Sequence, residues 1–64
     1  MKKLSVDYIN KNYKIINANL DKIKITNNDR TDFFICLNNI EISFNNIMQV
    51  IKGHRNYLKE NLRP

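Results

Sequence analysis

The second half of the chain has the sequence DFFICLNNIEISFNNIMQVIKGHRNYL from Asp32 to Leu58, and its apolar residues recur at alternating intervals of four and three. This spacing is typical of one side of an α-helix, which completes a turn in 3.6 residues. With one histidine among them, the residues of this row are Phe33, Leu37, Ile40, Phe44, Ile47, Ile51, His54 and Leu58. The pattern predicts a helix from about residue 31, with Asp29 or Thr31 as its N-cap.

A β-hairpin is the competing interpretation of the same segment. Residues 33–37 and 40–44 resemble two strands joined by a two-residue turn at Asn38 and Asn39. In the helical register, however, this Asn pair falls at the two positions farthest from the apolar row. Those positions recur as five pairs without an apolar member: Thr31 and Asp32, Asn38 and Asn39, Asn45 and Asn46, Lys52 and Gly53, and Lys59 and Glu60. Because one rule explains all five pairs, we favour the helix.

The first half of the chain repeats the helical spacing. Its apolar row is Val6, Ile9, Tyr13, Ile16, Leu20 and Ile23. Ser5 is a suitable N-cap, and the Asp7 carboxylate favours the positive end of a helix dipole. The row predicts a first helix over about 5–26, and the polar residues 27–29 predict a turn. We therefore expect an all-α fold, an antiparallel helical hairpin that forms a single small domain over residues 1–64.

Gly53 leaves the end of the second helix open. Glycine just past a helix end is a favoured cap, whereas glycine inside a helix costs about 1 kcal/mol relative to alanine. If Gly53 caps, the second helix covers about 31–52, and residues 54–63 form a short third helix or a basic tail. If it does not, the helix continues over about 31–62. The apolar row continues through His54 and Leu58, which favours the longer helix.

Length and composition limit the chemistry. The chain has 64 residues, one cysteine and one histidine. These counts allow no intramolecular disulfide and too few Cys and His side chains for a zinc site, so we expect Cys36 to be a small buried hydrophobe. With a single glycine, the sequence has no glycine-rich phosphate loop, and no paired carboxylates or nucleophile–base arrangement is evident. We expect no catalytic residues, no cofactor, no metal and no small-molecule substrate.

The second helix is apolar over more of its circumference than one neighbouring helix covers. A chain this short buries little surface by itself, and oligomerisation is one way for it to gain a core. We therefore expect two hairpins to pair, or one hairpin to dock on a partner protein, in a four-helix arrangement. The alternative is a third helix that completes a monomeric bundle. The expected interface residues are Phe33, Phe34, Leu37, Ile40, Phe44, Ile47, Met48, Ile51 and Tyr57.

The charge indicates a second, different kind of partner. The formal net charge is +5, and a basic chain attracts nucleic acid through phosphate contacts. The candidate contacts are Lys52, Arg55, Lys59 and Arg63. Basic side chains on an apolar protein also serve solubility, which is the simpler interpretation.

The longest apolar runs are too short for a membrane span, and no secretion signal is evident near Met1. Lys, Asn and Ile supply 30 of the 64 residues, which indicates an AT-rich genome. The sequence predicts a cytoplasmic, non-enzymatic interaction protein, such as a regulatory product of a bacterium, phage or plasmid. It binds and modulates a partner protein or forms a homodimer; a small basic nucleic-acid-binding dimer is the alternative.

Overall fold

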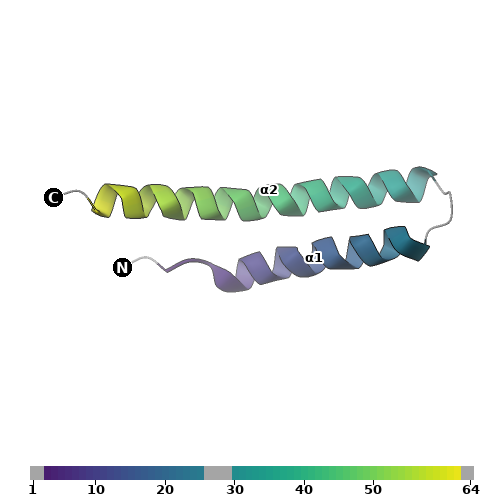
Figure 1. Ribbon diagram of the computed structural model, residues 1–64, viewed down its shortest axis with the longest axis horizontal. Helices are drawn as coiled ribbons and strands as arrows, with labels where there is room; N and C mark the ends of the chain where they lie inside the picture. The colour runs from purple at the N-terminus through teal and green to yellow at the C-terminus, as the bar shows by residue number, and fades with distance from the viewer. Residues whose placement is uncertain (1–2, 26–29, 63–64) are drawn as a thin grey trace.

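A computed structural model describes residues 3–25 and 30–62 of the chain. It contains two helices, α1 over Val6–Ile25 and α2 over Arg30–Asn61, which lie side by side and run in opposite directions (Figure 1). The predicted all-α hairpin is confirmed. The alternative of two strands within 33–44 is wrong, because α2 is continuous there.

The start of α1 agrees with the prediction, and the start of α2 corrects one of its proposed caps. Ser5 directly precedes α1, and its carbonyl accepts a hydrogen bond of 3.1 Å from the amide of Ile9. Since α2 begins at Arg30, Thr31 is inside the helix and is not its cap. The other proposed cap, Asp29, lies outside the described residues, as do Thr26 and the expected turn at 27–29.

Gly53 does not end the second helix. It lies inside α2, which continues to Asn61, so the longer of the two predicted helices is correct and the separate third helix is wrong. With 32 residues against the 20 of α1, α2 extends past the first turn of its neighbour (Figure 1).

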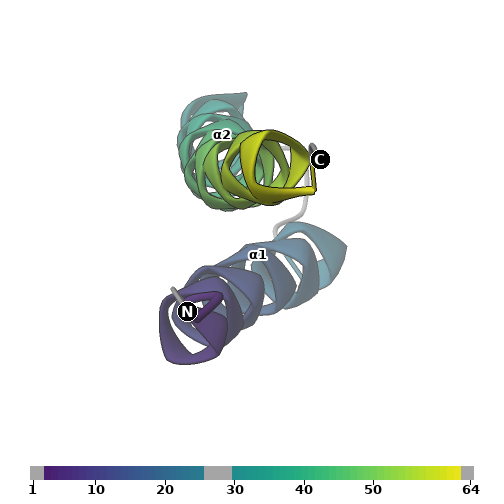
Figure 2. The ribbon, with the colours of Figure 1, turned by 90° about the vertical axis from the view of Figure 1, so that its left-hand side faces the viewer.

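The hairpin is a single layer with almost no apolar core. Figure 2 shows the two helices end-on, without a third element beside them in the described part of the chain. The radius of gyration is 15.9 Å, whereas a compact domain of this length would have about 11 Å. Among the described residues, Cys36 is the only hydrophobic side chain that is buried, as expected for this cysteine.

Candidate interaction surface

Along the line of contact between the helices, the interhelical seam, the most buried side chains are small or polar, with half-buried isoleucines beside them. Its buried members are Asn12, Cys36 and Ser43, which are exposed by 3%, 1% and 3% respectively. Asn19, Asn39 and Asn46 are half-buried beside them. The sequence had suggested that Asn39 and Asn46 lie on the outer side of the helix, and this is wrong.

Two asparagine pairs repeat along the seam. Asn46 Nδ2 donates to Asn12 Oδ1 at 3.1 Å, and Asn39 Nδ2 donates to Asn19 Oδ1 at 3.2 Å. Each α1 asparagine also donates from its own Nδ2 to the backbone carbonyl four residues earlier, at 2.9 Å and 2.7 Å. Seven residues separate the two pairs in both helices, so the bonds fix one antiparallel register.

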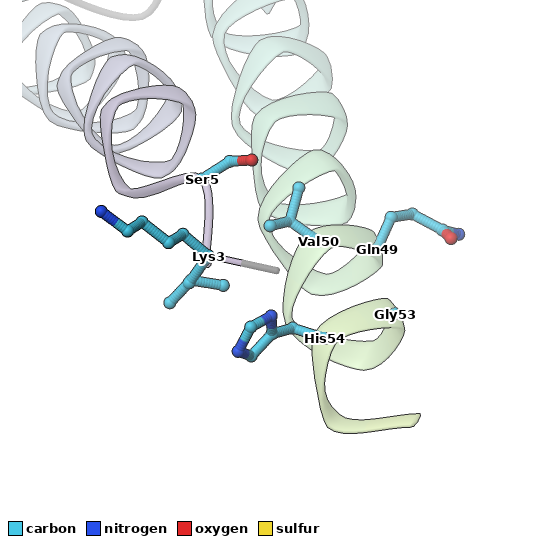
Figure 3. Close-up of a pocket in the computed structure, with 7 residues that line it drawn as sticks. Lys3, Ser5, Gln49, Val50, Gly53 and His54 are labelled. Carbon is cyan, nitrogen blue, oxygen red and sulfur yellow. The ribbon is translucent and has the colours of Figure 1, made fainter. Parts of the chain in front are cut away.

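The register continues to the open end of the hairpin. One further step of seven residues leads from Asn12 to Ser5 and from Asn46 to Gly53, and both residues line the same shallow pocket there (Figure 3). In Figure 3 the Ser5 side chain points toward α2. Both residues are exposed, and a Cβ built at Gly53 meets no atom within 4 Å, so the helices are not closely packed at this step. No buried side-chain nitrogen or oxygen within the described ranges lacks a hydrogen-bond partner.

Sequence reasoning missed this seam, although the signal was present. Asparagines spaced by seven stand at the same heptad position in the first helix (Asn12 and Asn19) and in the second (Asn39 and Asn46). A polar residue inside a helix pair sets register and partner choice at some cost in stability. The matched spacing of two such residues in each helix indicates a shared contact line rather than two solvent-facing sides.

The predicted apolar rows lie beside the seam and on one side of the hairpin. In α1, Val6, Tyr13 and Leu20 each follow a small polar residue of the seam line. In α2, Leu37 and Phe44 follow the buried Cys36 and Ser43 in the same way. A step of one residue turns the side chain by about 100° around a right-handed helix. Because the helices are antiparallel, this step leads to the same side of the hairpin in both.

We call this side the apolar face and define it by Val6, Tyr13, Leu20, Phe33, Leu37 and Phe44. All six side chains are exposed, Phe44 by 55% of its surface. They extend the half-buried rows Ile9, Ile16 and Ile23 of α1 and Ile40 and Ile47 of α2. The face thus spans both helices, and large contiguous apolar surfaces of this kind mark sites of protein–protein contact.

The predicted interface residues fall into two groups in the structure. Exposed to solvent are Phe33, Phe34, Leu37, Phe44 and Met48. Half-buried are Ile40, Ile47, Ile51 and Tyr57. Phe34 and Met48 lie at the outer edge of α2, on the side away from α1. Tyr57 lies next to His54, with ring centroids 6.2 Å apart. The row is therefore accessible along the first half of α2 and more sheltered along the second.

The opposite side of the hairpin is also partly apolar but is interrupted by polar residues. Its exposed apolar side chains are Tyr8, Ile15, Ile35 and Ile42. Lys11, Lys22, Asn38 and Asn45 interrupt them on the same side of their helices. Ile42 and Phe44 make a useful comparison, because they are similarly exposed, by 58% and 55%, but point to opposite sides of α2.

The predicted basic contacts gather near the C-terminal end of α2. Lys52, Arg55 and Lys59 are exposed and lie within two turns of one another along the helix. The fourth predicted contact, Arg63, lies outside the described residues. Three cations on one helix form a compact positive patch, although Glu60 lies among them.

The pocket at the open end of the hairpin is small. Its volume is about 210 Å³, and its lining includes Leu4, Val50 and His54 as well as Ser5 and Gly53 (Figure 3). Pockets for small molecules are commonly about 300 to 1,000 Å³ and deep enough to cover most of the ligand. Over residues 3–25 and 30–62 the structure brings together no three His, Cys, Asp or Glu side chains that could hold a metal ion.

Neither described helix is long and apolar enough to cross a membrane. Comparison of the chain with protein-family models, with curated proteins and with solved structures found no match.

Proposed function

We propose that this chain is a non-enzymatic interaction module of the cytoplasm. Its apolar face is buried against protein helices, supplied by another protein that it modulates or by a second copy of itself. In both cases the assembled form is a helical bundle in which the hairpin provides two neighbouring helices, giving the four-helix arrangement expected from the sequence.

One observation carries the proposal. The hairpin exposes six large apolar side chains on one side while burying a single hydrophobic side chain, that of Cys36, among the described residues. Apolar burial is the main favourable contribution to folding and to protein association. A chain that leaves many of its large apolar side chains exposed therefore has much of its stabilising surface available to a partner.

Site-specific photo-crosslinking in the native host tests the proposal. The photoreactive residue p-benzoylphenylalanine replaces Phe44 in one variant and Ile42 in the other. These positions match in exposure and lie on the same helix, but only Phe44 belongs to the apolar face. We expect ultraviolet light to produce discrete protein adducts from position 44 and few from position 42. Equal adducts from both positions, or none from position 44, would overturn the proposal.

The basic patch of Lys52, Arg55 and Lys59 supports the nucleic-acid-binding alternative as a second candidate function. Phosphate contacts release counterions, so such binding weakens steeply as salt rises. A gel shift with duplex DNA and with RNA at 50 and 200 mM salt is the direct measurement. Salt-dependent retardation that a Lys52→Ala, Arg55→Ala, Lys59→Ala triple variant abolishes would favour this alternative, and no retardation at 50 mM would remove it.

A further inference from the structure

We propose that the apolar face binds the same face of a second copy, with α2 antiparallel to α2 of the second copy. The two-fold axis is perpendicular to the helices and crosses them at the level of the Asn12–Asn46 hydrogen bond. This inference rests on the proposed function and names the partner, a second copy of this chain. Five observations support it.

The apolar row of α2 is complementary to itself in the antiparallel direction. If Phe44 contacts Ile47 of the second copy, the alternating intervals of four and three bring every residue of the row opposite another residue of the row. The four pairs are Phe44 with Ile47, Ile40 with Ile51, Leu37 with His54, and Phe33 with Leu58. Full overlap of the two α2 helices therefore requires no gap and no displaced register.

The same axis makes the apolar row of α1 complementary to itself. The midpoint of the α2 row lies next to Asn46, and the Asn46–Asn12 hydrogen bond places it beside Tyr13 of α1. Tyr13 is the middle of the exposed α1 row and has Val6 and Leu20 at equal distances along the chain. An axis at this level brings Tyr13 onto Tyr13 of the second copy and Val6 onto Leu20. Such an isologous contact uses one patch twice.

Helix length distinguishes this arrangement from the crossed one, in which α2 lies on α1 of the second copy. Since α2 has 32 residues and α1 has 20, crossing the hairpins would leave the last turns of α2 without a neighbour. Pairing α2 with α2 covers these turns, including half-buried Leu58.

Charge favours the antiparallel direction over the parallel one. The first half of α2 carries Arg30, Asp32 and Glu41, a net charge of −1, whereas the second half carries Lys52, Arg55, Lys59 and Glu60, a net charge of +2. Antiparallel pairing brings the acidic half of one α2 near the basic half of the other, and parallel pairing would align like charges.

The exposed area is sufficient for a stable dimer. The hairpin has 5664 Å² of accessible surface, whereas a compact monomer of 7.7 kDa would have about 4,300 Å². The excess, about 1,300 Å², exceeds the roughly 800 Å² that each partner buries in a standard interface. One face-to-face contact is enough to remove most of the excess.

Sedimentation equilibrium of the purified chain at tens of micromolar tests the partner. We expect twice the 7.7 kDa mass of the chain. Phe44→Asp should shift the protein to the monomer mass, whereas the matched variant Ile42→Asp should remain a dimer. A wild-type chain that sediments at the monomer mass and is helical by circular dichroism would overturn this inference. Adducts from position 44 in the host, at the mass of a different protein, would then still support the interaction module itself.

Disulfide trapping tests the register even where Phe44→Asp fails to fold. In a Cys36→Ala background, chains carrying Leu37→Cys are mixed with chains carrying His54→Cys and oxidised, because the antiparallel register pairs these two positions. We expect the mixed 37–54 disulfide to dominate, and a separate Tyr13→Cys chain to form a disulfide with itself. Preferential 37–37 and 54–54 products, or no disulfide through Tyr13→Cys, would overturn the proposed two-fold arrangement.

Discussion

Along α2, the residues that contact α1 differ in kind from those one position further. The interhelical seam contains Cys36, Asn39, Ser43 and Asn46, which are small or polar, whereas the apolar face contains two phenylalanines and a leucine. A monomeric hairpin would be expected to place its largest apolar residues between its helices. Here the most buried positions are small or polar and the phenylalanines are exposed, which indicates different roles for the interhelical seam and the apolar face.

The seam supplies register more than energy. One hydrogen bond makes a net contribution of about 1 kcal/mol to stability, whereas leaving a buried polar group without its partner costs about 1 to 3 kcal/mol. The asparagine pairs therefore penalise wrong alignments of α1 and α2 more than they stabilise the right one. The apolar face has the converse properties, because hydrophobic contact is non-directional and scales with area. The hairpin thus has its alignment fixed internally and gains most of its stability on association.

The largest effect is expected from enlarging a small residue of the seam. Ser43→Leu adds bulk at a position that is 3% exposed and lies against α1. Overpacking should separate the helices and lower the free energy of unfolding by about 2 to 3 kcal/mol. Urea unfolding followed by circular dichroism, at one fixed protein concentration, measures this loss. Ser43→Ala is the control and should change stability little. An equally stable Ser43→Leu variant would show that the seam is looser than described.

A smaller effect is expected from removing one partner of an asparagine pair. Asn12→Ala leaves the Nδ2 group of Asn46 without its acceptor and should cost about 1 to 2 kcal/mol. Because the two residues share one interaction, the Asn12→Ala, Asn46→Ala double variant should lose less stability than the sum of the losses in the two single variants. Additive losses in this double-mutant cycle would contradict the hydrogen bond.

The second pair provides a matched comparison for this cycle. Asn19 is half-buried whereas Asn12 is buried, and the Asn19–Asn39 bond has a similar length. Burial raises the cost of an unpaired polar group. The Asn19→Ala change should therefore be the milder one, and a reversed order would show that the two pairs are not equivalent repeats.

The sequence predicted the helices well, because intervals of three and four depend only on helix geometry. The chain reversal, the all-α fold and the start of the first helix beside Ser5 followed from that periodicity and from local capping preferences. The rotation of each helix about its own axis did not follow. Each helix has an apolar row next to a small polar row, and which row faces the neighbour depends on packing between segments far apart in sequence.

The candidate surface could be named from the sequence only as a set of residues. Phe33, Leu37 and Phe44 were identified as an apolar row, but their position on the same side as Val6, Tyr13 and Leu20 required the seam to be known. Once Asn12 and Asn46 align the helices, the two rows merge into one face. The two pairs of matched asparagines were the missing constraint. The sequence did not single them out, because an AT-rich genome accounts equally well for a chain with many asparagines.

The smallest effect concerns the one residue whose role the sequence left open. Gly53 lies inside α2, and a Cβ built there meets no atom within 4 Å. Gly53→Ala should therefore gain helix propensity without a clash and raise the free energy of unfolding by about 0.5 to 1 kcal/mol. Thermal unfolding at constant protein concentration measures the gain, with Gln49→Ala, one turn earlier, as an exposed control that should change little.

A loss of stability in Gly53→Ala would mean that α2 breaks at this residue. The overhanging end of α2, and with it the contact between Leu58 and Phe33 of the second copy, would then have no continuous helix to support it.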